Sequence, residues 1–163
     1  MVNEDQFRKA CGAFPTGVAI VTFAIDDTDV HGITISSFTS VSLRPPLILF
    51  CIHQQSRILP VLRCSQHFCI NILTSDHELL STDFAKHHSS ARFPVEWRRG
   101  PTGSPTLTGA LATLECSVKN VIPGGDHEIV LGEVVAASVA SGAPLVRFQG
   151  SYCNLSLVQT PHP

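Results

Sequence analysis

A row of hydroxyl side chains lies between His31 and Cys51, in the stretch HGITISSFTSVSLRPPLILFC. The hydroxyls occupy one phase of a two-residue repeat and aliphatic side chains occupy the other: Thr34, Ser36, Ser40 and Ser42 against Ile33, Ile35, Val41 and Leu43. Such a strand has one apolar face and one face of small polar groups. Those hydroxyls could bind a polar ligand, or they could simply let two elements pack closely. The period alone leaves both interpretations open.

A second polar group, HQQSR, directly follows the apolar segment 47–52. Ser56 and Arg57 close this group, just before a segment with helical spacing. Hydroxyls, the free N–H groups of a helix start and an arginine are what a phosphate group needs. The alternative is that Ser56 only caps the helix.

Other familiar kinds of chemistry find little support. Cys64, His67 and Cys69 are spaced like metal ligands, but the flanking apolar residues place Cys69 inside a strand and no second cluster follows. The sequence has no Gly-x-Ser-x-Gly elbow and no phosphate loop of the Walker type, and neither His-Glu pair has the second histidine of a zinc protease. We therefore expect no metal site and no nucleophilic catalysis.

Composition narrows the class of protein. Only 15% of the 163 residues are charged, which is low for a free surface and suggests that a partner subunit covers part of it. The formal net charge of −2 is not that of a nucleic-acid-binding protein, which is usually basic. The longest apolar run is too short to span a membrane. The first residues do not resemble a secretory signal, and we expect the six cysteines to be buried thiols, so a cytoplasmic location follows.

The elements that must position these groups are mostly strands. Helices are expected at 3–13, 56–63 and 75–84, and strands at 18–25, 31–43, 47–52, 68–73, 111–122, 128–139 and 145–155. The first two strands are joined by the turn 26–29 and should form a hairpin, the strand 47–52 should be central, and 87–106 should be an irregular loop. Many short strands with small helices predict a single mainly β domain over 1–163, a closed or nearly closed barrel with peripheral helices.

Six segments, taken in order, resemble a known family. They are FPTGVAIVT, GITISSFTSVSLRPPLILF, FCINIL, DFAKHHSSARF, LECSV and DHEIVLGEV. Their order and spacing are similar to those of the flavin reductase-like proteins, the small reductase components of two-component flavin monooxygenases. The resemblance implies an FMN-binding split β-barrel that binds FMN or FAD as a homodimer, with the flavin near the subunit interface.

The resemblance also implies site residues. Its cofactor contacts fall on Pro15, Thr16, Gly17, Thr34, Ser36, Ser37, Ser56, Arg57, Phe84, Ala85 and Arg92. Among these, Ser56 and Arg57 would hold the phosphate. His127 would be the catalytic residue, because it matches the Asp-His pair that faces the nicotinamide in relatives. Ser36 and Ser37 can reach the same ligand only if the strand bulges or ends between Ser36 and Phe38.

The function implied by the resemblance is NAD(P)H-dependent reduction of FMN or FAD. Hydride would pass from the nicotinamide to flavin N5, no side chain would need to act as acid or base, and the reduced flavin would supply a partner monooxygenase. The sequence shows no basic cluster for a 2′-phosphate, which favours NADH over NADPH, and it leaves FMN and FAD open. The alternative function is a flavin-binding or sensing protein of the same fold that reduces nothing.

Overall fold

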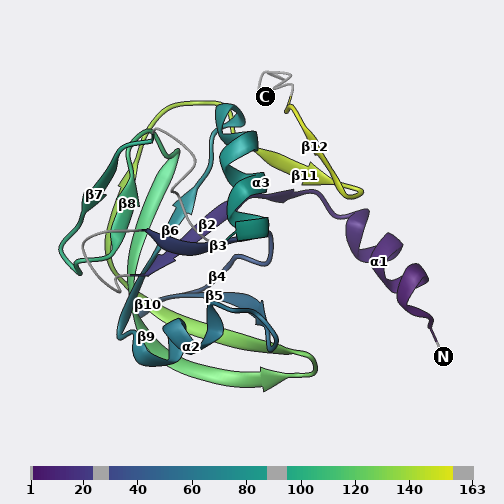
Figure 1. Cartoon of the computed structure of the whole chain (residues 1–163), viewed down its shortest axis with the longest axis horizontal. Coiled ribbons are helices and arrows are strands. Elements are labelled where there is room, and N and C mark those ends of the chain that lie inside the picture. The colour runs from purple at the N-terminus through teal and green to yellow at the C-terminus, as the bar shows by residue number, and fades with distance from the viewer. Residues whose placement is uncertain (1, 24–29, 88–94, 156–163) are drawn as a thin grey trace, which may run out of the picture.

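Seven antiparallel strands form the main sheet, in the spatial order β3-β2-β6-β9-β10-β5-β4 (Figure 1). The computed structural model describes residues 2–23, 30–87 and 95–155, and every structural statement below concerns these residues. The strands of this sheet are β2 (Ala19–Phe23), β3 (His31–Ile35), β4 (Thr39–Leu43), β5 (Pro46–His53), β6 (His67–Ile72), β9 (Ala112–Gly124) and β10 (His127–Val139). Its two edge strands, β3 and β4, are consecutive in the chain, and β3 also contacts β5. The sheet therefore curls into a barrel that is split between β3 and β4, as predicted.

Aromatic rings fill the centre of this barrel. Phe23, Phe50 and Phe68 have no exposed surface, and the Phe50 and Phe68 rings meet edge to face with centroids 5.3 Å apart. Strand β5 contributes Phe50 from an alternating pattern, in which every second side chain is buried and the others are half-exposed or exposed. The prediction that this strand is central is confirmed, because β5 pairs with β10 on one side and with β4 on the other, but only one of its faces is in the core.

The helices lie outside the barrel. Helix α1 (Glu4–Gly12) begins at Asn3, whose Oδ1 accepts a hydrogen bond of 2.8 Å from the Gln6 amide in a capping box. Helix α2 (Leu59–Cys64) is shorter than predicted and has Pro60 in its first turn. Helix α3 (Glu78–His87) follows a 3₁₀ turn, Ser75–His77, that is capped by Thr74.

Two smaller sheets correct the sequence-based prediction. Strands β7 (Trp97–Arg99) and β8 (Pro105–Leu107) pair within the segment expected to be irregular. The expected single strand 145–155 is a hairpin of β11 (Val146–Phe148) and β12 (Ser151–Cys153), and it pairs with β1 (Thr16–Gly17) outside the barrel. Strands of two or three residues are too short for a period to reveal them.

The hairpin predicted for the first two strands is confirmed, since β2 and β3 pair from Ala19↔Ile35 to Phe23↔His31. The turn expected at 26–29 lies outside the described residues. All six cysteines are free, but only Cys69 and Cys116 are buried, while Cys11, Cys64 and Cys153 are exposed. No described helix has the length and apolar character needed to cross a membrane.

Candidate functional site

The corner between β3 and β4 separates the two adjacent serines. Strand β3 ends at Ile35 and β4 begins at Thr39, so the hydroxyl row is not one continuous strand. The Ser37 Oγ accepts a hydrogen bond of 2.9 Å from the Cys51 amide and lies 3.2 Å from the Cys51 carbonyl, to which it donates. Ser36 is exposed on the other side of the corner. The strand break anticipated at Ser36–Phe38 is present. Because of this break, the Ser37 hydroxyl bonds to the backbone of β5, whereas Ser36 is exposed.

Ser36 lines a hollow of about 340 Å³ together with the turn that precedes the barrel. The residues around it are Phe14, Pro15, Thr16, Gly17, Val18, Ala19, Ser36, Phe38, Thr39 and Ile72. The turn is fixed in place because β1 pairs with β11 and the Val18 amide donates to the Leu145 carbonyl at 3.1 Å. Four of the predicted cofactor contacts, Pro15, Thr16, Gly17 and Ser36, therefore meet in one hollow.

The lining of this hollow suits a flavin ring. Phe14, with 74% of its surface exposed, and the half-buried Phe38 offer flat apolar surface, which an isoalloxazine needs on its faces. Within the described part of the chain, the hydroxyls of Thr16 and Ser36 have no hydrogen-bond partner. They are free to pair with the polar edge of a bound ring.

A second group of polar side chains lies at the far end of β5. His53 and His127 are directly opposite each other in the β5–β10 ladder, and their rings meet edge to face with centroids 5.0 Å apart. The carboxylate of Asp126 joins them, with one oxygen 2.7 Å from His127 Nδ1 and the other 3.9 Å from His53 Nε2. The hydrogen bond from His127 is the main cause that lowers the pKa of Asp126 below its ordinary 3.8. Asp126 thus stays ionised and fixes the orientation of the His127 ring.

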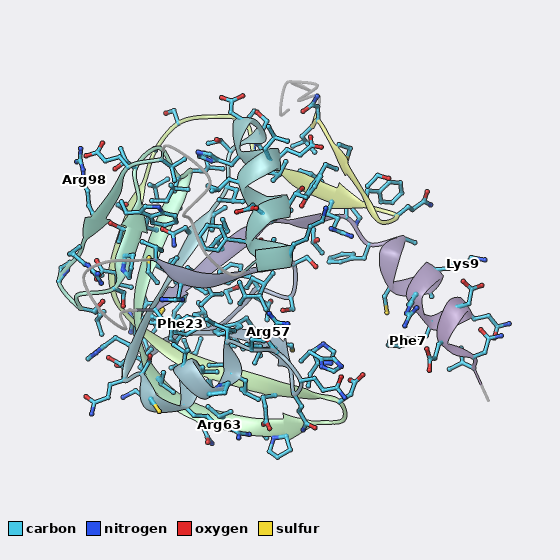
Figure 2. The ribbon with its side chains drawn as sticks, viewed as in Figure 1. Phe7, Lys9, Phe23, Arg57, Arg63 and Arg98 are labelled. Carbon is cyan, nitrogen blue, oxygen red and sulfur yellow. The ribbon has the colours of Figure 1, made fainter. Side chains whose placement is uncertain are left out.

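Ser56 and Arg57 follow His53 in the same region, where the chain enters α2 (Figure 2). The Ser56 amide donates to the His53 carbonyl at 2.9 Å, and the Ser56 Oγ accepts from the Ile58 amide at 3.4 Å. Arg57 is exposed and forms no ion pair with any carboxylate of the described residues. Its guanidinium is therefore available to an anion.

Strand β5 links the hollow to the histidine group. Ser37 is hydrogen-bonded to Cys51, and His53 lies two residues further along the same half-exposed face of the strand. Two residues of a strand span about 7 Å. His53 is thus about 7 Å along β5 from the residue that holds the corner.

The other predicted contacts lie apart from these two groups. The Thr34 hydroxyl donates to the Ser81 carbonyl of α3 at 2.6 Å. The Phe84 ring has no exposed surface and packs against Trp97 with centroids 5.8 Å apart, so it belongs to the core beneath α3, whereas Ala85 is exposed. Arg92 lies outside the described residues.

Sequence reasoning missed Phe38 and Arg147, and it included His53 only as a member of the polar group HQQSR, without its pairing to His127. Phe38 was missed because a continuous strand was expected there, and the pairing of His53 was missed because His127 is distant in the sequence. Arg147 is opposite Thr16 in the β1–β11 pair, and strands this short have no sequence period that would predict the pairing. Among the described residues, no group of three or more His, Cys, Asp or Glu side chains is arranged to hold a metal ion.

The chain matches the model of the flavin reductase like domain over residues 11–156 and therefore belongs to the flavin reductase-like family. The reductase subunit HsaB of a flavin-dependent monooxygenase from Rhodococcus jostii strain RHA1 is 36% identical over 155 residues, which cover 94% of this chain and 79% of that protein. An NADH-dependent flavin reductase from a Rhodococcus species is 41% identical over 165 residues, covering 99% of this chain and 92% of the relative.

Solved structures agree with this assignment. The NADH:FAD oxidoreductase SgcE6 of Streptomyces globisporus, in complex with NAD and FAD fragments, superposes with a TM-score of 0.88 at 34% identity. The match covers 98% of this chain and 99% of that one. The split barrel inferred from the sequence is therefore confirmed.

Proposed function

We propose that this protein is an NADH-dependent flavin reductase that supplies reduced FMN or FAD to a partner monooxygenase. The observation that carries the proposal is the hollow at the β3–β4 corner, where apolar rings meet two hydroxyls that have no partner among the described residues, and β5 leads from this corner to an oriented histidine pair. Similar proteins named as NADH-dependent reductases and as reductase subunits of monooxygenases support the same conclusion.

The residues of the hollow and those at the far end of β5 have different roles in this proposal. Pro15, Thr16, Gly17 and Ser36 hold the flavin ring, and Arg57 pairs with its phosphate. A flavin held there would supply the redox chemistry, as the acceptor of a hydride from the reduced nicotinamide. His127, held by Asp126, positions the nicotinamide against the exposed ring face and moves no proton.

His127→Ala tests this assignment. Oxidation of NADH, followed at 340 nm with added FMN or FAD, should fall severalfold, while the Kd for flavin should change by less than about twofold, because the histidine contacts the nicotinamide only. His67→Ala, which removes a half-buried histidine of β6, is the matched control and should leave both quantities unchanged. If His127→Ala turns over at the wild-type rate, His127 has no part in the site. A yellow wild-type protein that oxidises neither NADH nor NADPH would instead establish the flavin-binding alternative.

The same proposal includes a homodimer. Helix α1 extends away from the barrel, and none of its residues is buried (Figure 1). Phe7, labelled on α1 in Figure 2, is 60% exposed, and Phe14 at the end of the helix is 74% exposed. A nine-residue helix is marginal in water without a packed face, so a second copy that covers this face would stabilise it. Sedimentation should give a dimer for the wild type and a monomer for Phe7→Asp, and a wild-type monomer at micromolar concentration would contradict the dimer.

A cytoplasmic location is part of the proposal as well. All six cysteines are unpaired, and three of them are exposed. Exposed thiols persist in a reducing compartment, which is also where NADH is available.

A further inference from the structure

A buried carboxylate on β10 has no part in the roles assigned above. Glu128 belongs to the inward-facing phase of this strand, together with Val130 and Gly132, and it is opposite the buried Ile52 of β5. Only 8% of its side chain is exposed. Taking a carboxylate out of water is costly unless polar or charged groups bind it, and an apolar side chain of similar size often fills such a place at least as stably. The groups that bind Glu128 therefore indicate its role.

Two side chains of the segment 54–63 donate to the same oxygen of Glu128. Arg63, in the last turn of α2, places its Nη2 3.3 Å from Oε1, and the Nε2 of Gln54 lies 3.5 Å from the same atom. Between these two side chains the segment contains Ser56 and Arg57, and Figure 2 labels Arg57 and Arg63 on it. One carboxylate thus ties both ends of the segment to β10.

The backbone and the core hold the segment in the same place. The Gln54 amide donates to the Asp126 carbonyl at 2.9 Å, next to the last residue pair of the β5–β10 ladder. After Arg57, the residues Ile58 and Leu59 are buried, each with 3% of its surface exposed. Arg57 itself is exposed between these two fixed points. The position of its guanidinium therefore depends on how firmly the ends of the segment are held.

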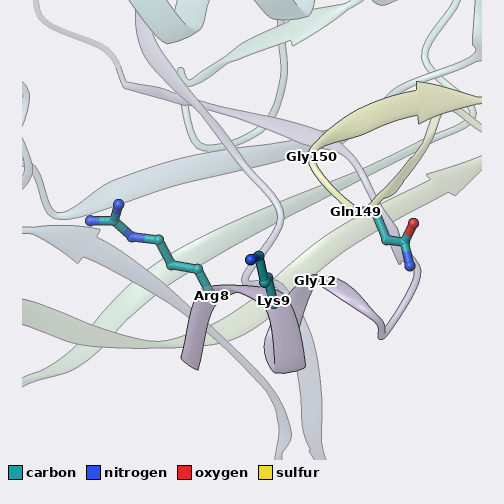
Figure 3. A pocket seen from close by; sticks show the side chains of 5 residues that line it. All are labelled: Arg8, Lys9, Gly12, Gln149 and Gly150. Atoms are coloured by element: carbon teal, nitrogen blue, oxygen red, sulfur yellow. The ribbon is translucent and has the colours of Figure 1, made fainter. Parts of the chain in front are cut away.

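The exposed ion pairs on α1 differ in this respect. Arg8 and Lys9, which line a hollow of about 560 Å³ between α1 and the β11–β12 turn (Figure 3), pair with Glu4 and Asp5. These pairs join residues one turn apart on the same helix, all four side chains are exposed, and such pairs contribute little to stability. The pair between α2 and β10 instead joins two different elements, and the burial of its carboxylate reduces screening by water and salt.

We propose that Glu128 is a positioning residue for the phosphate of the flavin. It holds the segment 54–63 against β10, so that the guanidinium of Arg57 already lies where the phosphate binds. Arg57 then loses less conformational freedom when it pairs with the phosphate, which strengthens binding without any contact between Glu128 and the ligand. The inference rests on the proposed function, which assigns the phosphate to Arg57.

The test compares the Kd of FMN with the Kd of riboflavin, both measured by fluorescence quenching. The two ligands share the ring and the ribityl chain, and only FMN has the phosphate, so the ratio of the two Kd values isolates the phosphate contact. Glu128→Gln keeps the shape of the side chain and removes its charge, and Arg63→Gln removes the partner charge from an exposed position. Each substitution should reduce the preference for FMN about threefold to tenfold and leave the Kd of riboflavin within about twofold of wild type. The double variant should lose no more than the single variants, because both act through one pair.

Two ion pairs outside the segment provide matched controls. Glu133→Gln removes a carboxylate of the same strand, which pairs with Lys119 of β9. Arg98→Gln removes an exposed arginine of β7, which pairs with Glu96 at 3.2 Å. Both variants should keep the wild-type ratio within about twofold. Arg63→Lys keeps the positive charge and should keep most of the preference for FMN.

Two results would overturn the role of Glu128. One is a wild-type ratio of Kd values in either Glu128→Gln or Arg63→Gln, and the other is an equal loss of FMN and riboflavin affinity, which would indicate a general disturbance of the fold. If Glu128→Gln does not fold, Arg63→Gln decides alone, because the Arg63 side chain is 60% exposed. Arg57→Gln tests the proposed function separately, since it should abolish most of the preference for FMN. If Arg57→Gln keeps that preference, the proposed phosphate site is wrong, and the role of Glu128 is rejected with it.

Discussion

Replacing the two adjacent serines of the β3–β4 corner by alanine should separate folding from binding. Ser37 closes the corner onto β5 through two hydrogen bonds to the backbone of Cys51. Ser36 makes no hydrogen bond within the described chain, and it lines the hollow that we propose holds the flavin ring. The two substitutions remove the same hydroxyl one residue apart, so their effects on unfolding and on flavin affinity can be compared directly.

The expected magnitudes follow from these contacts. Ser37→Ala removes the acceptor of a partly buried amide and the donor to the adjacent carbonyl, which should lower the free energy of unfolding by about 1–2 kcal/mol and Tm by about 2–8 °C. Ser36→Ala should leave the unfolding free energy within about 0.5 kcal/mol. It should weaken flavin binding by about 1 kcal/mol, or about fivefold, through the loss of one neutral hydrogen bond.

Thermal unfolding monitored by circular dichroism and flavin titration by fluorescence quenching measure the two effects. Ser40→Ala is the control, because Ser40 is an exposed hydroxyl of the same row on β4 but lies outside the lining of the hollow. It should change neither quantity. The division of roles is refuted if Ser36→Ala lowers Tm as much as Ser37→Ala, or if Ser37→Ala weakens flavin binding fivefold with an unchanged Tm.

Two further predictions concern packing in the core and the dependence of folding stability on low pH. Gly132→Ala should lower the free energy of unfolding in urea by about 2–3 kcal/mol, because a Cβ there would lie too close to the buried Phe68 ring. Gly142→Ala is the control and should be nearly neutral, because its Cβ would meet only ordinary contacts. Equal losses of stability in the two variants would contradict this packing. Because the pKa of Asp126 is lowered in the folded state, its ionised form contributes stability that is present above about 3.8 and lost as pH falls through the lower folded value. The stability advantage of wild type over Asp126→Asn should therefore shrink in urea titrations below pH 3.8, and an advantage that grows there would reverse the assigned sign.

The sequence predicts the barrel well because its long strands carry clear periods and recognisable turns. Strands β9 and β10 lie within two residues of their predicted ranges, and the turn between them is marked by Pro123-Gly124-Gly125-Asp126. The β7–β8 hairpin was missed because it depends on distant contacts. The Glu115 carboxylate of β9 accepts hydrogen bonds from the Thr102 amide and hydroxyl, at 2.9 and 2.7 Å, and so fixes the turn between the two short strands.

The site is predictable only where its residues are close in sequence. Pro15, Thr16 and Gly17 belong to one motif and indeed reach one hollow with Ser36. The assignment of Ser36 and Ser37 to the same ligand depended on the direction of each side chain, which the corner sets. Arg147 could not be placed beside the hollow from its sequence neighbours, because it is brought next to Thr16 by the β1–β11 pairing, which joins distant parts of the chain.

The alternation of β5 couples the barrel core to both parts of the site. Its buried phase, Ile48, Phe50 and Ile52, fixes which residues face inward. The half-exposed face therefore contains Cys51, whose amide donates a hydrogen bond to Ser37 at the corner, and His53, whose ring contacts that of His127. A slip of one residue would bury His53 and turn Phe50 toward solvent, so the apolar core opposes such a slip strongly. The hydrophobic packing of one face thereby fixes the distance between the flavin hollow and the histidine pair on the other.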